Sequence, residues 1–149
     1  MARIDLLNKG DRLPDLTLPE ALGGTVRLGD FHGRRNLVLF WTHPAGCAPC
    51  ESLLRELSDN LALLQSEDAE VLAIVPGAPV RTAELKERLA IAFPLLVAAE
   101  EPACGQLSML VADRFGEIFV AARAVEADQL PGGAQLAEEL AFIQLQCPE

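Results

Sequence analysis

Two cysteines separated by two residues have the clearest chemical potential in this sequence. The segment reads Cys47-Ala48-Pro49-Cys50, and leucines at helical spacing follow it directly. A thiol attacks a disulfide only as its thiolate, and a helix N-terminus lowers the pKa of a sulfur placed there. We therefore interpret Cys47 as an attacking thiolate. Cys50, one turn later, is interpreted as the resolving thiol that closes a disulfide with it.

Three neighbouring residues are candidates for supporting roles. Pro49 suits the first turn of a helix, and it removes an N–H donor beside the sulfurs, which would tune their reduction potential. His43 lies four residues before Cys47, where a protonated imidazole would favour the thiolate. The alternative for His43 is a loop histidine exposed to water. Trp41 either shields the sulfurs or packs within a sheet.

A C-x-x-C pair also serves as half of a zinc site, and inert thiols are a third interpretation. A zinc site needs two more ligands, whereas the remaining cysteines and histidines are scattered: His32, His43, Cys104 and Cys147. The order of strand, short loop, C-x-P-C and helix favours redox chemistry without a metal or an organic cofactor. Cys104 and Cys147 are expected to be small buried hydrophobes, with a second option that Cys147 reaches a sulfur in the same or a neighbouring chain.

Composition limits the other classes of function. The chain has 149 residues, half of them hydrophobic, which fits a single domain over residues 1–149 with a packed core. Its formal net charge is −10, so nucleic acid and anionic membrane surfaces are not expected partners. No apolar run is long enough to span a membrane, and the N-terminus lacks the apolar core of a signal peptide. These features predict a cytoplasmic protein.

Hydrophobic periodicity predicts an α/β fold. The expected elements, in order, are a hairpin from residues 13–19 and 25–28, a strand at 36–41, a helix from 49 through 64, a strand at 70–75, a helix at 81–92, an extended segment at 93–97, a hairpin from 109–112 and 118–121, and a helix at 134–146. Strands and helices alternate first, and an antiparallel pair follows. That order predicts a mixed central sheet with helices on both faces and an N-terminal β-hairpin extension.

Several segments, in this order, resemble the redoxins, the superfamily of alkyl hydroperoxide reductase and thiol-specific antioxidant (peroxiredoxin) proteins and their thioredoxin-like reductase relatives. The matching segments are residues 10–16, 25–31, 37–41, 47–50, 93–96 and 110–118, and the likeness covers about residues 10–121. The resemblance implies a thioredoxin-like fold with an N-terminal extension and thiol-based redox chemistry.

The resemblance leaves the reaction open. One alternative is a thiol–disulfide oxidoreductase acting on a disulfide-bearing protein or a small thiol, and the other is a thiol-dependent peroxidase acting on a hydroperoxide. Both require a thiol electron donor. From another class comes a binding module that senses redox state or holds zinc. The oligomeric state is open as well.

The chain departs from both branches of the superfamily. Peroxiredoxins place Thr or Ser three residues before the reactive cysteine and Pro seven before it, where this chain has Pro44 and Phe40. Residues 103–112 lack the family's arginine, and residues 106–109 lack the cis-proline of thioredoxin-like reductases. Leu39 replaces the buried aspartate of thioredoxin. Glu51 and a bound water are therefore the candidate proton acceptors for Cys50.

Overall fold

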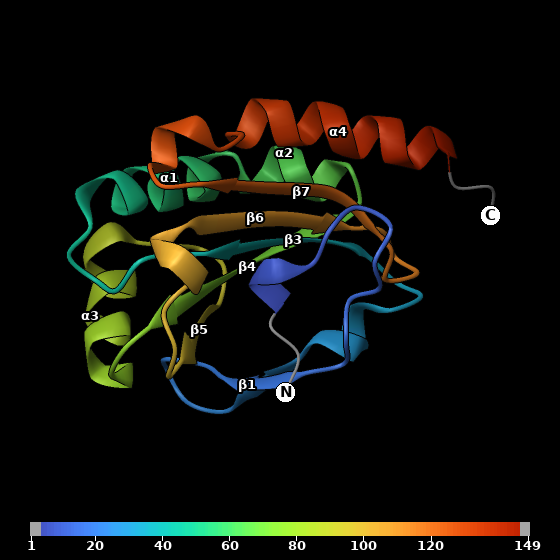
Figure 1. Ribbon diagram of the computed structural model, residues 1–149. Helices are drawn as coiled ribbons and strands as arrows, with labels where there is room; N and C mark the ends of the chain where they lie inside the picture. Colours follow the sequence, from blue (N-terminus) through green and yellow to red (C-terminus); the bar gives the residue numbers. More distant parts are fainter. Residues whose placement is uncertain (1–3, 147–149) are drawn as a thin grey trace.

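The computed structural model describes residues 4–146, and its central element is a five-stranded sheet (Figure 1). The strands are β3 (Asn36–Trp41), β4 (Ala69–Pro76), β5 (Leu95–Ala98), β6 (Leu107–Ala112) and β7 (Ile118–Ala124). They lie in the order β5-β4-β3-β6-β7. β3 and β5 run parallel to β4, whereas β6 runs antiparallel to both β3 and β7. The predicted mixed sheet is confirmed.

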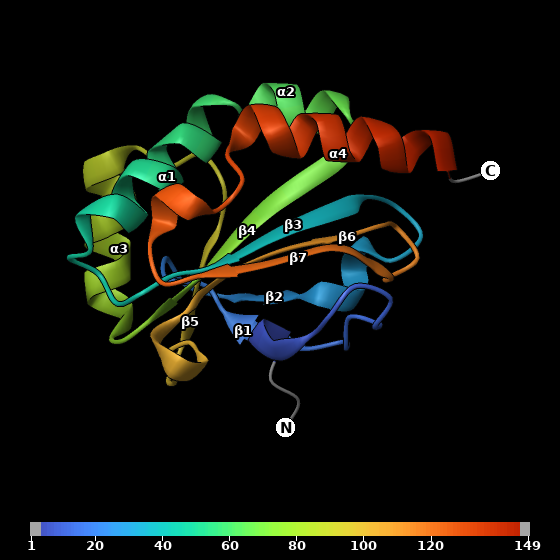
Figure 2. The same cartoon turned by 45° about the horizontal axis from the view of Figure 1, so that its top comes forward.

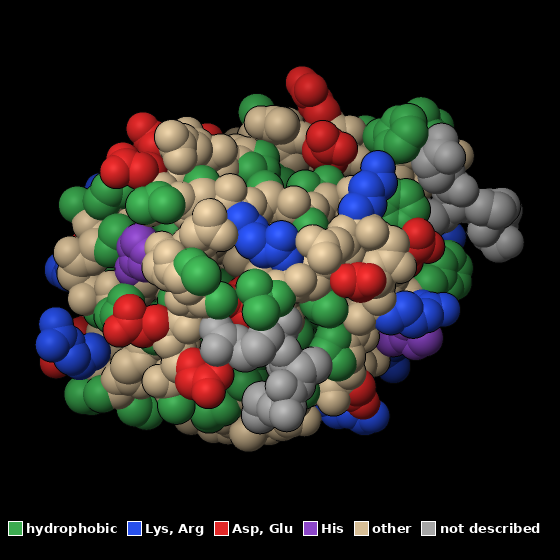
Figure 3. Space-filling model, viewed as in Figure 1, with side chains coloured by type: hydrophobic (Ala, Val, Ile, Leu, Met, Phe, Trp, Pro, Cys, Tyr) green, Lys and Arg blue, Asp and Glu red, His purple; other side chains and the backbone are tan. Residues whose placement is uncertain are grey.

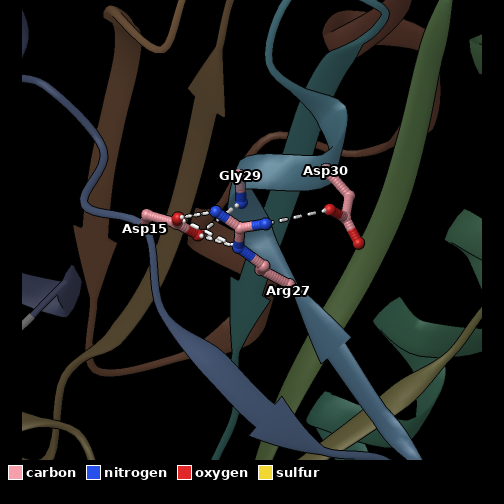
Figure 4. A network of polar contacts seen from close by, with 4 residues as sticks. All are labelled: Asp15, Arg27, Gly29 and Asp30. Carbon is pink, nitrogen blue, oxygen red and sulfur yellow. Dashed lines mark hydrogen bonds and ion pairs between the residues drawn. The ribbon is translucent and has the colours of Figure 1, made fainter.

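An N-terminal arm carries the predicted hairpin, β1 (Thr17–Pro19) paired antiparallel with β2 (Thr25–Arg27). Two single-turn 3-10 helices flank it, η1 (Ile4–Leu6) and η2 (Leu28–Phe31). Figure 4 shows how the junction of β2 and η2 is fixed. The carboxylate of Asp15 accepts hydrogen bonds from the Arg27 guanidinium at 2.7 Å and from the Gly29 N–H at 2.9 Å.

The arm is tied to both edges of the sheet. On one side Glu20 forms an antiparallel bridge with Leu96, which belongs to the edge strand β5. On the other side Arg123 of β7 donates to the carbonyl oxygens of Asp5, at 2.7 Å, and of Leu7. The N-terminal extension is therefore an integral layer of the fold.

The α-helices are α1 (Ala48–Asp59), α2 (Leu61–Ser66), α3 (Pro79–Leu89) and α4 (Gly133–Gln146). The buried leucines of all four belong to one hydrophobic cluster, together with side chains from one face of the sheet. Figure 2 shows α1, α2 and α4 above the sheet and the hairpin below it. On that lower face the helical cover consists of the 3-10 turns, which contribute Ile4 and Leu28.

The central strand β3 is buried along its whole length because both of its faces are covered. Side chains on a strand alternate between the two faces. Val38 and Phe40 accordingly pack with the helices, whereas Leu37, Leu39 and Trp41 pack under the N-terminal arm. The continuous apolar run in the sequence is the consequence of this two-sided burial.

The predicted helix over residues 49–64 is wrong in one respect, because it is interrupted at Asn60. Asn60 has φ −100° and ψ 11°, outside the helical region. Its side-chain N–H donates to the carbonyl oxygen of Glu56 at 2.8 Å. The backbone N–H of Asn60 donates to the same oxygen at 3.0 Å, so Asn60 caps the C-terminus of α1, and α2 begins at the next residue.

The boundaries of the second predicted helix and of the extended segment after it also differ from the prediction. Helix α3 begins at Pro79, which suits a first-turn position, and it ends at Leu89 because Ala90 adopts a left-handed conformation with φ 53°. Strand β5 begins only at Leu95, after Pro94, which has no N–H to donate. Lys86 bonds the carbonyl oxygens of Ile91 and Phe93 and fixes this connection.

Acidic and basic side chains are interspersed over the face drawn in Figure 3. Within residues 4–146, no helix combines the length and the apolar character that crossing a membrane requires.

Candidate active site

The two cysteines lie at the carboxyl end of β3, where the chain leaves the sheet and enters α1. Cys47 is the N-cap residue of α1, and Pro49 occupies the first turn, as predicted. The Cys47 sulfur accepts a hydrogen bond from the backbone N–H of Cys50 at 3.4 Å. A sulfur in this position faces the unpaired N–H groups and the positive end of the helix dipole.

The two sulfurs differ in exposure and in acidity. Cys47 is partly exposed, whereas Cys50 is only 2% exposed. Burial, reinforced by the hydrogen bond with Cys47, raises the pKa of Cys50 to about 12. Partial burial also acts to raise the pKa of Cys47, but hydrogen bonds from Cys50 and His43 outweigh it and lower that pKa. The accessible sulfur is therefore the one that ionises first.

His43 contacts Cys47 through one ring nitrogen and the backbone through the other. Its Nε2 lies 2.8 Å from the carbonyl oxygen of Gly105, and its Nδ1 lies 3.6 Å from the Cys47 sulfur. A carbonyl oxygen only accepts hydrogen bonds, so Nε2 carries a proton and Nδ1 is left to exchange a proton with Cys47. The Gly105 carbonyl raises the pKa of His43, burial opposes the rise, and the contact with Cys47 adds to it.

Gly105 comes from a segment 62 residues away from His43 in the chain. It ends the single turn η3 (Ala103–Gly105), just before residues 106–109, the segment that lacks the cis-proline expected of thioredoxin-like reductases. The described part of the chain contains no cis peptide bond. In this protein the same segment instead presents a carbonyl oxygen to the histidine of the site.

Cys104 precedes Gly105 in this turn, and the prediction that it is buried is wrong, because its side chain is exposed. The residue has a left-handed backbone with φ 57°. The tight turn that brings the Gly105 carbonyl to the site leaves Cys104 on the surface. Cys147, the fourth cysteine, lies outside the described residues.

Glu51, in the first turn of α1, is held by an ion pair. Both of its carboxylate oxygens accept from the guanidinium of Arg88 in α3, at 3.0 and 3.1 Å, and one accepts from the N–H of Gly46 at 3.3 Å. The bond from Arg88 lowers the pKa of Glu51. A carboxylate engaged in this way is a weak base, so the structure argues against Glu51 as the proton acceptor for Cys50.

The remaining predicted residues lie elsewhere. Trp41 packs on the face of the sheet that the arm covers, whereas both sulfurs belong to the cluster on the helical face. Of its two interpretations, packing within the sheet is the one found. Trp41 also lines an apolar cavity of about 660 Å³ beneath the arm. His32 bonds the carbonyl oxygen of Phe115, in the turn between β6 and β7.

The fold brings three of the candidate metal ligands together. The donor atoms of His43, Cys47 and Cys50 all lie within 4.8 Å of one another, and no other such group of three or more is found in residues 4–146. Neither the contact of His43 with Gly105 nor the ion pair of Glu51 with Arg88 could be read from local sequence, because each joins segments far apart in the chain.

Comparison with known proteins identifies the family of the chain. Residues 9–126 match the AhpC/TSA family. The chain is 35% identical over 97 residues, 64% of its length, to a Mycobacterium tuberculosis protein whose name describes it as a peroxiredoxin. That match spans 60% of the relative's length.

Solved structures share the fold. Peroxidoxin BcpB from Mycobacterium tuberculosis superposes with a TM-score of 0.77 at 18% identity, covering 94% of this chain and 98% of that one. A thiol:disulfide interchange protein from Bacteroides sp. superposes with a TM-score of 0.71 at 16% identity, covering 91% and 90%. The expected thioredoxin-like fold is confirmed. Because the match covers most of the chain, with the dithiol, the helix that follows it and all five strands of the sheet, the chain belongs to the AhpC/TSA family.

Proposed function

We propose that this protein is a thiol–disulfide oxidoreductase in which Cys47 attacks and Cys50 resolves. The observation that carries the proposal is the asymmetry of the two sulfurs. The partly exposed one has a lowered pKa, and the buried one has a raised pKa. An attacking group must be both accessible and ionised, whereas a resolving group must stay protonated until a mixed disulfide has formed.

The reaction begins when the Cys47 thiolate attacks one sulfur of a substrate disulfide. The substrate S–S bond breaks, a Cys47–substrate disulfide forms, and the other substrate sulfur leaves as a thiolate that takes up a proton. Cys50 then loses its proton and attacks the Cys47 sulfur, which releases the second substrate thiol. Two electrons have passed to the substrate, and a thiol donor of the cell reduces the resulting Cys47–Cys50 disulfide.

His43 is proposed to serve both steps. While Cys47 is a thiolate, a protonated His43 stabilises it from 3.6 Å. Once Cys47 is tied up in the mixed disulfide, that charge is gone. The imidazolium gives its Nδ1 proton to the leaving substrate thiolate, and the freed ring nitrogen, within 4.8 Å of the Cys50 sulfur, can then accept the Cys50 proton. This assignment supplies the proton acceptor that the paired carboxylate of Glu51 does not.

The second candidate is a thiol-dependent peroxidase, and membership of the AhpC/TSA family favours it. In that reaction the Cys47 thiolate attacks a hydroperoxide, which yields a sulfenic acid and an alcohol. Cys50 then condenses with the sulfenic acid, so that water leaves and the same disulfide forms. Both reactions need Cys47 and Cys50, and only the oxidising substrate distinguishes them.

The test is to trap the mixed disulfide. The Cys50→Ser variant, incubated with a peptide disulfide, should accumulate a covalent adduct on Cys47 that mass spectrometry locates. Cys47→Ser should form none, and the control Cys104→Ser should turn over like the parent protein. Absence of an adduct together with rapid hydroperoxide consumption would move the assignment to the peroxidase. Absence of both activities would refute the redox proposal.

We further propose that residues 1–149 act as one domain and that the protein works in the cytoplasm. The negative charge supports a protein or small-thiol partner over nucleic acid.

A further inference from the structure

The active-site sulfurs and the adjacent imidazole form a cluster of metal-binding atoms as well as a redox pair. We propose that the reduced protein binds a zinc ion through the sulfurs of Cys47 and Cys50 and the Nδ1 of His43. The proposal goes beyond the proposed function, because a metal ion would bind these three atoms whether or not the protein turns over a disulfide.

The first argument is the geometry of the donors. Zinc lies about 2.3 Å from thiolate sulfur and about 2.0–2.1 Å from imidazole nitrogen, so tetrahedral angles place a sulfur and a nitrogen about 3.6 Å apart. The Cys47 sulfur and the His43 Nδ1 are separated by 3.6 Å in the structure. The Cys50 sulfur lies within 4.8 Å of both, and tetrahedral coordination needs about 3.8 Å between two sulfurs. The Cys50 sulfur is therefore close enough to serve as the third ligand.

The second argument is independent of the sulfurs and concerns the other side of the imidazole. Histidines that bind metal ions usually donate their second N–H to a carbonyl or a carboxylate, which fixes the tautomer and turns the lone pair toward the ion. The Gly105 carbonyl makes this contact with His43 Nε2 at 2.8 Å. It leaves the Nδ1 lone pair directed at the sulfurs, as a zinc ligand requires.

The chemistry of the donors favours a soft or borderline ion. Two thiolates and one imidazole select zinc over magnesium or calcium, which bind oxygen ligands. Two thiolates also neutralise the charge of the ion. Three protein ligands leave a fourth position for water or an incoming thiol, and the partial exposure of Cys47 and His43 keeps that position open to solvent.

Zinc binding and redox state are then linked. The oxidised protein has no thiolates at this position, so zinc binds only the reduced form and stabilises it. Above the dissociation constant, each tenfold increase in free zinc should raise the midpoint potential of the Cys47–Cys50 pair by about 30 mV. Bound zinc also occupies the lone pairs of the attacking sulfur, so it should block reaction of that sulfur with alkylating agents and substrates.

The test uses the full chain with Cys104 and Cys147 changed to Ser, reduced and freed of reductant under anaerobic conditions. Zinc should bind one to one in equilibrium dialysis and should protect Cys47, the accessible cysteine, from alkylation. The disulfide form should bind none. His43→Ala should weaken binding about 100-fold, the upper end of the loss expected even for a change behind a ligand. The matched control His32→Ala should leave the affinity unchanged.

Three results would overturn the proposal. The first is the absence of stoichiometric zinc on the reduced protein. The second is an equal affinity in His43→Ala, which would show that the thiols bind the ion without the imidazole. The third is a midpoint potential that does not respond to zinc. Circular dichroism of His43→Ala, compared with His32→Ala, separates loss of a ligand from loss of the fold.

Discussion

Removing the imidazole beside Cys47 should lower the fraction of that residue present as thiolate, and the distance between the two groups gives the size of the effect. His43→Gln keeps a polar side chain but removes the charge that lies 3.6 Å from the Cys47 sulfur. Because both side chains are partly exposed, we use the dielectric constant of water, about 80. At 3.6 Å the lost attraction between the imidazolium and the thiolate is then about 1.2 kcal/mol. That energy corresponds to about an eightfold fall in the ratio of thiolate to thiol.

The assay is the rate of iodoacetamide alkylation in a background that retains only Cys47. At about pH 6, where an imidazole with a raised pKa is charged, His43→Gln should react about threefold more slowly, because the higher nucleophilicity of the more basic thiolate offsets part of the eightfold loss of thiolate. Its rate profile should move to higher pH, because the pKa of Cys47 rises when the cation is lost. His32→Gln is the matched control, since His32 also bonds a backbone carbonyl but touches neither cysteine. An unchanged rate in His43→Gln, or an equal loss in both variants, would refute the reasoning.

Two further predictions concern stability. The pKa of Cys50 is about 12 in the folded protein against an ordinary 9.0, so folding favours the protonated thiol. The free energy of unfolding of the reduced protein should therefore fall as the pH rises from about 9 toward 12, and this loss should be absent in Cys50→Ser. The free energies come from urea unfolding at each pH. An equal dependence on pH in both proteins would contradict the prediction. Leu57 is a fully buried residue of α1, so Leu57→Ala should lower the free energy of unfolding by about 2–5 kcal/mol. Leu145→Ala, at a position 84% exposed, should fall within about 0.5 kcal/mol of the parent in the same denaturation assay, and equal losses in both variants would argue against this packing.

The fold was predictable because its signals are local. The five consecutive apolar residues of β3 and the leucine spacing after Cys50 are each contained in one short segment, and together they place the dithiol at the start of a helix. The interruption at Asn60 was harder to predict, since the leucine pattern continues across it. The boundary between α1 and α2 lies at Asn60, whose side chain donates a hydrogen bond to the carbonyl oxygen of Glu56 in the previous turn.

The surroundings of the dithiol were less predictable, because they depend on backbone atoms and on contacts between distant segments, which residue types do not reveal. The Gly105 contact that orients His43 is made by a backbone carbonyl, and any residue type supplies one. The exposure of Cys104 follows from the same turn. The pairing of Glu51 with Arg88 needs the relative placement of two helices, which periodicity does not provide.

The N-terminal arm has a consequence for the order in which the chain folds. Asp5 and Arg123, which join the arm to β7, are separated by 118 positions. Closing so long a loop is entropically unfavourable until the sheet exists to receive the arm, so we expect the residues of the arm to dock last. Until they do, the leucines of β3 on that side have no cover. This late intermediate is therefore the state in which the chain is most prone to self-association.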